Sequence, residues 1–582
     1  MSERPVVTPR RPITRVVCTI AVAMLVMAAC DLRMARAGTT CSKVGDFAQD
    51  GTYVLKCSPR HRWVRGITTA AGDAAVAYVK SLATTSTVAE PTTTAIATTS
   101  TTITATTSTS TTTTTAPPPP SDVPTFLNGV AHTGYNGAET IVNASSAPAL
   151  TRRWTAAASN GAYISTQPIV ADGVVYWGDS NGNEYATNAT TGAHIWTRNV
   201  GSSGLLDANP DICGPTSEGV GGASTVATVG GHHLLFVGGG GNVNGPDGNG
   251  VYYYALDADT GTIFWQTKIG LGPTPAAHSD PNPYDMVWAG SVLSSTSGTP
   301  SLYVAVAAHG DCSHYAHGRV LKLNAASGAV DQTTFLGVGA CLGSDVWGTP
   351  TIDEAAHKVY ISTSEAEPSC AATTAQPYAD SLVELDASSL AIVDSWQLSL
   401  LTDPYSADHD FGTTPILFHD GSRSLVGAVN KNGKFYAFVR DHLSDGPVWS
   451  HHVSDPGDAG PDNGSGSISP AAFDGTNLYV SGGYQDWTNQ TCAPVESLDP
   501  ATGVAHWTRC VAGPVLGAVS AAPGIVAVGA GSHLEVLASS NGAVLKDVSW
   551  DAAAAWIFAT PTIANGWIYV AGSAGNLYGV SP

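Results

Sequence analysis

Positive charge is scarce in this sequence. Only 25 of its 582 residues are Lys or Arg, against 46 Asp or Glu, and the formal net charge is −21. Because the phosphate backbone of nucleic acid is bound mainly through Lys and Arg, this balance excludes nucleic acid as a partner. A net charge of this size is typical of a soluble extracellular protein that charge keeps dispersed.

The sequence also lacks a C-x-x-C-H motif, which excludes a covalently attached c-type haem. No two of its ten cysteines are adjacent. Cys18 and Cys30 fall in the N-terminal leader, and the other eight form an even set. An even number of cysteines in an exported chain is typical of disulfide bonds.

The leader is interpreted as a signal peptide over residues 1–37. A basic segment precedes the apolar run Val16–Ala29, which is too short for a comfortable membrane span, and Ala35–Ala37 reads as an A-x-A cleavage site. An alternative is a lipobox, because Met27–Cys30 reads MAAC and would leave Cys30 as a lipid-anchored N-terminus. The sequence thus predicts a secreted or extracellular protein, with anchoring to the cell envelope as the alternative.

Two further segments precede the main domain. Residues 38–82 hold Cys41 and Cys57 around a short β-like run, and a module this small needs a Cys41–Cys57 bridge because it cannot build a core alone. Residues 83–122 consist almost entirely of Thr, Ser, Ala and Pro, so we expect a disordered linker.

A repeated unit organises the rest of the chain. Val251–Gly270, VYYYALDADTGTIFWQTKIG, predicts a strand, a tight turn and a second strand that carries Trp265. Variants of this unit return every 40–60 residues, roughly the spacing at which a propeller repeats its four-stranded blades. We interpret the Trp at the end of each unit as packing between blades. These residues are Trp196, Trp265, Trp396, Trp449 and Trp507.

Counting the repeats predicts an all-β, eight-bladed propeller over residues 123–582. The predicted blades are 166–200, 221–270, 287–337, 346–398, 411–453, 467–513, 515–550 and 557–580. The last of them supplies only about three strands. We expect Ala149–Ala156 to add the missing outer strand, because this would close the ring and leave no open edge.

The repeat at Ala255–Trp265, ALDADTGTIFW, resembles the pyrroloquinoline quinone (PQQ) propeller repeat, and Asn128–Trp154 resembles the start of quinoprotein dehydrogenases of the polyvinyl-alcohol dehydrogenase type. The resemblance covers roughly residues 125–582. It implies a quinoprotein that oxidises a small-molecule or polymeric alcohol with PQQ and Ca²⁺. Because no haem motif is present, an external partner would accept the electrons.

Such chemistry needs an aromatic floor and a cation for the quinone. The resemblance places the floor at Trp347, in SDVWGTP, and the cation at Lys431, with Asn432 beside it in NKNGKFY. Trp347 is expected on an innermost strand that faces the channel. The alternative for Trp347 is a plug that fills the channel, and the alternative for Lys431 is an ordinary turn residue.

Quinoprotein chemistry also needs a base for the alcohol proton and oxygen ligands for the metal. The motif DHDFGTTP places Asp408 and Asp410 as base or metal neighbour. Glu365 follows Thr363 and Ser364 where the family often has T-G-N, so it is the expected carboxylate ligand, and Asp311 is the acidic candidate in the third blade. The alternative for the two carboxylates of DHDFG is capping of loop amides. Three histidines near Asp311 do not match a defined zinc spacing. They are His309, His314 and His317.

Cysteine positions predict the remaining bridges. Cys492 and Cys510 flank one hairpin of the sixth blade, and Cys341 and Cys370 flank the first strands of the fourth. Cys213 and Cys312 would then join the second and third blades. Other connectivities among the last four cysteines are also compatible with the sequence.

Two functions remain open at this point. The first is an exported, monomeric quinoprotein alcohol dehydrogenase. The second is a non-catalytic propeller that binds a protein or glycan at the cell envelope, which requires only the fold. A geometric criterion separates them: the enzyme requires Trp347, Glu365, Lys431 and an aspartate of DHDFG to converge on one mouth of the channel.

Overall fold

The computed structural model divides the chain into two compact units, residues 1–113 and 114–582. It describes residues 47–49, 53–57, 63–68, 120–202, 218–240, 250–270, 285–308, 316–339, 341–367, 374–398, 409–457, 463–549 and 556–582. The first unit contains an antiparallel sheet of β1 (Phe47–Gln49), β2 (Tyr53–Cys57) and β3 (Trp63–Thr68). The predicted signal peptide, the linker up to residue 119 and the Cys41 end of the predicted bridge lie outside the described residues.

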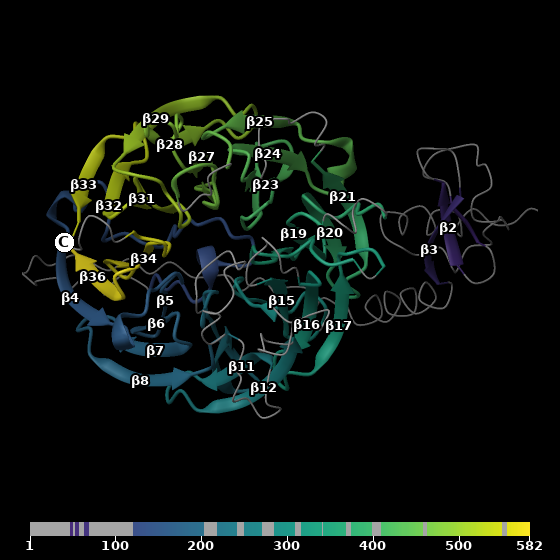
Figure 1. The fold of residues 1–582 in the computed structure, drawn as a ribbon, viewed down its shortest axis with the longest axis horizontal. Coiled ribbons are helices and arrows are strands. Elements are labelled where there is room, and N and C mark those ends of the chain that lie inside the picture. Colours follow the sequence, from purple (N-terminus) through teal and green to yellow (C-terminus); the bar gives the residue numbers. More distant parts are fainter. Residues whose placement is uncertain are drawn as a thin grey trace, which may run out of the picture. The chain divides into compact units, whose positions relative to one another are not determined.

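Eight antiparallel sheets follow one another in the second unit (Figure 1). The first sheet contains β5 (Ile169–Ala171), β6 (Val174–Gly178), β7 (Asn183–Asn188) and β8 (His194–Asn199), and the second contains β9 (Thr225–Val229), β10 (His232–Gly238), β11 (Val251–Asp257) and β12 (Ile263–Gly270). The third contains five strands, β13 (Asp285–Met286), β14 (Val292–Ser294), β15 (Ser301–Ala308), β16 (Arg319–Asn324) and β17 (Val330–Phe335). The fourth contains β18 (Thr351–Asp353), β19 (Lys358–Ser362), β20 (Ser381–Asp386) and β21 (Ile392–Gln397).

The fifth sheet contains β22 (Ile416–His419), β23 (Ser424–Asn430), β24 (Lys434–Val439) and β25 (Trp449–His452), and the sixth contains β26 (Ala472–Phe473), β27 (Leu478–Ser481), β28 (Ala493–Leu498) and β29 (Ala505–Val511). The seventh contains β30 (Ser520–Ala522), β31 (Ile525–Ala530), β32 (His533–Ala538) and β33 (Val544–Val548). The eighth contains β34 (Thr562–Ala564), β35 (Trp567–Ala571), β36 (Asn576–Ser581) and β4 (Thr151–Ala157). The predicted eight-bladed, all-β propeller is confirmed, and the sheets are numbered below as blades one to eight in this order.

The N-terminal strand closes the ring. β4 pairs antiparallel with β36, with Trp154 opposite Gly579 (Figure 1). The Trp154 ring fills the space above Gly579, where an added Cβ would come within 2.1 Å of the indole. The outer strand of blade eight thus comes from the other end of the domain, as expected for a propeller that leaves no open edge.

The repeated turn explains how neighbouring blades lock together. In blade two, Asp257 Oδ1 accepts the backbone N–H of Thr260 at 2.9 Å, and Gly261 has φ +68°. A Cβ on Gly261 would lie 2.7 Å from the ring of Trp196, which belongs to the preceding blade. Trp196 Nε1 also donates to Ala258 O at 2.9 Å. Trp196, at the end of blade one, is therefore a packing residue, as the sequence indicated.

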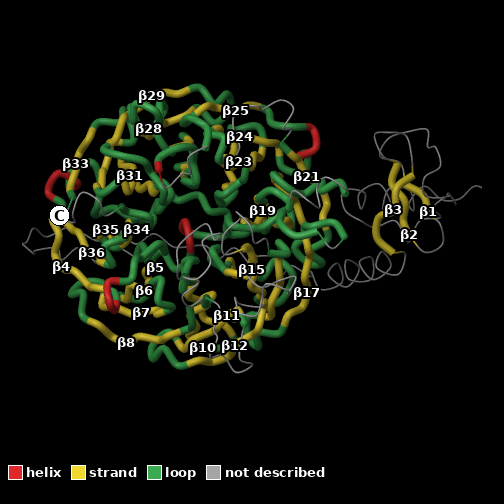
Figure 2. The backbone as a smooth tube through the Cα atoms, in the orientation of Figure 1, coloured by secondary structure: helices red, strands yellow, loops and turns green. Residues whose placement is uncertain are grey.

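The described helices are short 3₁₀ turns at Phe126–Asn128, Ala147–Ala149, Ser159–Gly161 and Leu443–Asp445, so strands and loops dominate the tube drawing (Figure 2). Within the described ranges, no helix combines the length and the apolar character needed to cross a bilayer.

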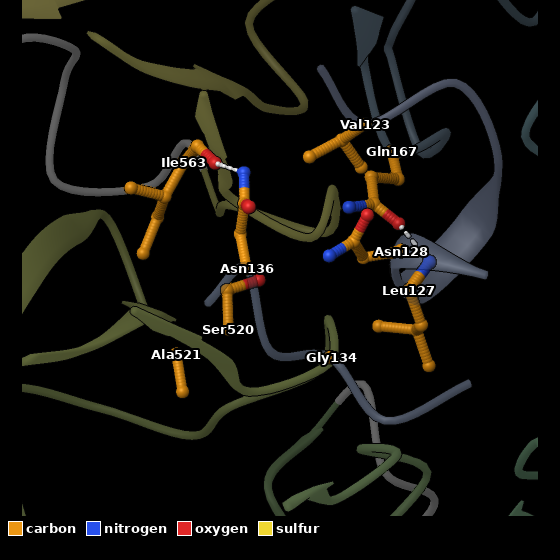
Figure 3. Close-up of a pocket in the computed structure, with 9 residues that line it drawn as sticks. All are labelled: Val123, Leu127, Asn128, Gly134, Asn136, Gln167, Ser520, Ala521 and Ile563. Atoms are coloured by element: carbon orange, nitrogen blue, oxygen red, sulfur yellow. Dashed lines mark hydrogen bonds between the residues drawn. The ribbon is translucent and has the colours of Figure 1, made fainter. Parts of the chain in front are cut away.

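Residues 121–136, called the plug below, cross the ends of the inner strands. Backbone hydrogen bonds join the plug to six blades: Val123 with Val170, Pro124 with Val226, Val130 with Ile352, Ala131 with Leu417, Thr133 with Phe473, and Gly134 with Ala521. Asn136 Nδ2 reaches blade eight by donating to Ile563 O at 2.9 Å, and Leu127 N donates to Gln167 Oε1 at 2.9 Å (Figure 3). The cavity between these residues measures about 10 Å³, which is space for one water molecule. The plug therefore packs closely against this end of the channel.

Candidate functional site

The other end of the inner strands holds a central cavity of about 150 Å³. All eight blades contribute to its wall, and Phe126 of the plug also lines it. Each inner strand begins at this end of the propeller and finishes at the plug, so residues just before an inner strand gather around one mouth. The SDVWGTP and DHDFGTTP segments both occupy such positions, before β18 and β22.

Trp347 lines the central cavity. Its Nε1 is buried without a hydrogen-bond partner. Its ring packs against Trp288 of blade three, with ring centroids 5.7 Å apart and planes inclined by 30°. Lys431 Nζ lies 6.0 Å from the centroid of the Trp347 ring. Trp347 therefore lines the channel, but it lies in the segment before β18 and not on the inner strand itself, where the sequence predicts it.

Asp410 joins the other expected residues to Lys431. Its Oδ2 lies 2.7 Å from Lys431 Nζ, and its Oδ1 accepts the backbone N–H of Glu365 at 2.8 Å. The backbone N–H of Lys431 in turn donates to the backbone carbonyl oxygen of Asp410 at 2.9 Å. Asp410 is fully buried, and the Lys431 side chain is 14% exposed. Trp347, Glu365, Asp410 and Lys431 thus converge on one mouth of the channel, which is the criterion derived from the sequence.

The electrostatics of Asp410 follow from these contacts. Burial by itself pushes the pKa of the carboxyl upward, but the charge of Lys431 and the N–H of Glu365 outweigh burial and lower the pKa to about 2. Asp410 is therefore an ionised carboxylate over the whole neutral range. Because a carboxylate has about four lone-pair positions, it can accept a further hydrogen bond.

Glycines make the position of Lys431 possible. The NKNG segment is a tight turn between β23 and β24, in which Asn432 N donates to Asn430 Oδ1 at 2.8 Å. An added Cβ on Gly466 would come within 2.4 Å of Lys431 O, and one on Gly412 would lie 3.5 Å from its side chain. The glycines of the neighbouring loops therefore leave the space that the lysine occupies.

Three carboxylates come together beside Lys431. One oxygen each from Glu365, Asp380 and Asp410 lies within 4.8 Å of the others, and the Asp380 and Asp410 side chains are buried. Carboxylate oxygens are the ligands that Ca²⁺ prefers. Sequence reasoning missed Asp380, because it lies in an irregular segment before β20 with no motif around it, at a positive φ of 47°.

Trp288 was also missed, although a signal was present. The segments DMVW at residues 285–288 and SDVW at residues 344–347 repeat a V-W pair shortly before consecutive inner strands, β14 and β18. The two rings meet in the structure, so the repeated pair marked both residues.

The remaining expected residues have different outcomes. Asn432 is buried, and its Nδ2 donates to Tyr436 Oη at 2.8 Å, so its contacts serve the turn. Asp408 and Asp311 lie outside the described residues. Cys492 and Cys510 form a disulfide across their hairpin, as expected. Cys341 is also disulfide-bonded, whereas Cys370, Cys213 and Cys312 lie outside the described residues.

Comparison with known families and proteins gives related results. The model of a PQQ-repeat family described as outer membrane protein assembly factor BamB matches residues 138–390. The polyvinylalcohol dehydrogenase of Sphingopyxis sp. (strain 113P3) is 24% identical over 385 residues, which cover 54% of this chain and 55% of that protein. BamB of Salmonella typhimurium is 30% identical over 145 residues, covering 23% of this chain and 32% of BamB. The matches thus span about half and about a third of these relatives.

Solved structures share the fold at low identity. The quinohemoprotein alcohol dehydrogenase of Comamonas testosteroni has a TM-score of 0.58 and 16% identity, with 79% of this chain and 80% of that chain covered. A europium-containing methanol dehydrogenase has a TM-score of 0.60 and 14% identity, with 79% and 98% covered. The family match over residues 138–390 covers less than half of the chain, and at this identity the structural likenesses show that the domain shares the propeller fold of these dehydrogenases.

Proposed function

We propose that this protein is an exported quinoprotein dehydrogenase that oxidises an alcohol with PQQ and a bound metal ion, and passes the electrons to an external acceptor. One observation carries the proposal. Four residues from two neighbouring blades, spread over 85 positions of the sequence, meet at this mouth: Trp347, Glu365, Asp410 and Lys431. Lys431 contacts both Asp410 and the Trp347 ring, and Asp410 contacts Glu365. Packing between blades does not require this combination of groups.

The residues present fit an aromatic polyanion. PQQ is a flat ring system with three carboxylates, and it needs an aromatic face and a positive charge. Trp347 supplies the face and has a buried N–H without a partner, while Lys431 supplies the charge within 6.0 Å of the ring. Glu365, Asp380 and Asp410 supply oxygen ligands for Ca²⁺ or another hard cation.

The chain's own residues account for proton transfer and charge. When bound, PQQ supplies a quinone that takes two electrons from the alcohol carbon. Asp410 accepts the hydroxyl proton, since it is an ionised carboxylate at the mouth of the channel. Lys431 stabilises negative charge that develops on oxygen beside it. The plug closes the opposite end of the channel, so substrate and acceptor reach the site from the mouth where these residues lie.

Reconstitution tests the proposal directly. The purified full-length chain is incubated with PQQ and Ca²⁺ and desalted, and retained quinone is measured by absorbance. Reduction of an artificial dye is then followed with simple alcohols and with polyvinyl alcohol. We expect retention of about one quinone per chain and alcohol-dependent dye reduction. A chain that retains no quinone with Ca²⁺ or with a lanthanide ion would rule out the proposal.

Asp410→Asn is the variant that tests the role of the base. It keeps the shape of the side chain and removes the proton acceptor, so we expect quinone retention with a rate lowered by roughly 10²–10⁴-fold. Asp394→Asn, on the outer strand β21, is the matched control. Equal rates for Asp410→Asn and the wild type would assign the proton to another group.

A groove at the plugged end favours a second candidate function, a binding scaffold. It encloses about 540 Å³ beside Val130 and Tyr135 of the plug, and apolar side chains of blades five and six form part of it, including Leu417 and Phe473. Such a surface fits a protein or glycan partner at the cell envelope. Tyr135→Ala would then abolish partner binding while leaving quinone retention intact, which separates this function from the enzyme.

A further inference from the structure

The two indoles at the channel mouth form an offset stack. The Trp288 and Trp347 centroids are 5.7 Å apart and their planes are inclined by 30°. Two indoles lying side by side in one plane would keep their centroids farther apart, so part of one ring covers part of the other. Offset stacking is a preferred arrangement of aromatic pairs. One face of Trp347 is therefore partly covered by Trp288.

Trp288 is itself held firmly in place. Its Nε1 donates to Ala308 O at 2.8 Å, at the end of the fully buried strand β15. Gly221 of blade two packs against the ring, where an added Cβ would come within 3.2 Å of it. Both contacts come from elements outside the segment that carries Trp347. Trp288 thus gives the Trp347 ring a support that is independent of the backbone of blade four.

The wall of the cavity is asymmetric around its axis. Blades three and four contribute the two indoles, whereas blades one and five contribute small residues at comparable positions, such as Ser165 and Gly412. Lys431 approaches Trp347 from blade five, whose equivalent position is the small residue Gly412. A flat ligand beside Gly412 could therefore reach both the indole and the cation.

We propose that Trp288 is a positioning residue for a planar, polyanionic cofactor, and that it acts by fixing the plane of the Trp347 indole. This inference rests on the proposed function, since it assigns a second aromatic residue to the same site. Trp288 does not need to touch the cofactor. It sets the angle at which Trp347 presents its ring to the cofactor, and that angle determines how well a ligand stacks while it also reaches Lys431 and the carboxylates.

Binding of PQQ to the full-length chain tests this role without relying on turnover. Quenching of tryptophan fluorescence gives the Kd in the presence of Ca²⁺, and near-ultraviolet circular dichroism reports the paired indoles. We expect Trp288→Leu to weaken PQQ binding by roughly tenfold, the upper range of one aromatic pair. Trp288→Phe keeps a stacking ring and should restore most of the affinity. Trp265→Leu, at a blade junction away from the mouth, is the control and should bind as the wild type does.

The outcomes separate the two proposals. If the wild type binds PQQ and Trp288→Leu binds equally well, the role of Trp288 is wrong and the proposed function stands. If the wild type binds no PQQ, the proposed function falls and this inference falls with it. If Trp288→Leu unfolds, the PQQ affinity of Trp288→Phe is the deciding measurement. If Trp288→Phe keeps the wild-type unfolding midpoint but binds PQQ as weakly as Trp347→Leu does, the proposed role of Trp288 is wrong.

Discussion

Lys431 Nζ lies 2.7 Å from Oδ2 of Asp410, a fully buried carboxylate in the neighbouring loop. This ion pair joins the turn between β23 and β24 to the segment before β22. Its lysine also lies 6.0 Å from the centroid of the Trp347 ring, and its aspartate also belongs to the cluster with Glu365 and Asp380. A single contact thus links the cation, the proposed base and the aromatic floor. Its removal has consequences for stability as well as for ligand binding.

Lys431→Met leaves the Asp410 charge buried without its main partner. We expect this change to lower the free energy of unfolding at pH 7 by roughly 3 kcal/mol, as for other broken buried pairs. The pKa of Asp410 in the folded state lies below its unfolded value of 3.8, so the stabilisation is present above pH 3.8 and is lost as the pH falls towards 2. Denaturant unfolding of Lys431→Met and of the half-buried control Lys546→Met, on an outer strand, checks the difference. Equal stabilities at pH 7 would contradict it.

His132 links the plug to blade four and predicts acid sensitivity. The ring is fully buried, with Nδ1 3.0 Å from Phe126 O and Nε2 3.0 Å from Pro350 O. Burial lowers its pKa from 6.5 to about 4, although both carbonyls favour the charged form. Protonation therefore favours the unfolded state: the stabilisation is complete above pH 6.5 and is lost as the pH falls towards 4. It amounts to roughly 3 kcal/mol at most.

The comparison of wild type with His132→Gln isolates this contribution. We expect the unfolding free energy of the wild type to fall between pH 6.5 and 4 more steeply than that of His132→Gln. His194→Gln, on the exposed outer strand of blade one, serves as the control and should follow the wild type. Parallel curves for the wild type and His132→Gln would show that His132 does not titrate in this window.

The architecture was readable from the sequence because each blade repeats the same local physics. The Asp-x-x-Thr-Gly turn of blade two requires a positive φ at Gly261, and the ring of Trp196 packs against this glycine because it has no side chain. Turn, strand and packing signals therefore coincide in a short stretch. The site carries no such repetition. Asp380 joins Glu365 and Asp410 from an irregular segment of blade four, and the packing of blade four against blade five places it near Asp410.

Glu184 predicts the opposite pH dependence to His132. It is fully buried, and burial raises its pKa to about 8, although the Ser224 hydroxyl donates to Oε1 at 2.5 Å. The folded pKa exceeds the unfolded value of 4.5, so the stabilisation is present below pH 4.5 and is lost as the pH rises towards 8. Glu184→Gln removes this loss, and we expect it to be more stable than the wild type by roughly 3 kcal/mol at pH 7. If the stability of Glu184→Gln changes between pH 5 and pH 8 by as much as that of the wild type, the prediction is wrong.

The Cys492–Cys510 bond staples the outer hairpin of blade six, with a sequence separation of 18. A loop of this length predicts a loss of about 3 kcal/mol when both cysteines are replaced by serine. Thermal unfolding of Cys492→Ser/Cys510→Ser checks the loss, with Ser422→Ala on an exposed turn as the control. Because the bond lies on an outer hairpin, we expect retention of quinone to survive at temperatures well below the transition. Loss of quinone binding in the folded variant would instead place this hairpin in the site.

Trp154 is the residue whose loss should open the ring. It is 8% exposed, its ring packs against Tyr569 with centroids 5.9 Å apart, and its Nε1 donates to Ala189 O at 3.1 Å. It therefore joins the closing strand both to blade eight and to the next blade in the ring. We expect Trp154→Ala to lower the free energy of unfolding by roughly 3–5 kcal/mol, as for other large aromatic residues removed from a core. Trp265→Ala leaves the closure intact, so hydrogen exchange should show opening of β4 and β36 in Trp154→Ala alone. Equal protection of these strands in both variants would mean that closure does not depend on Trp154.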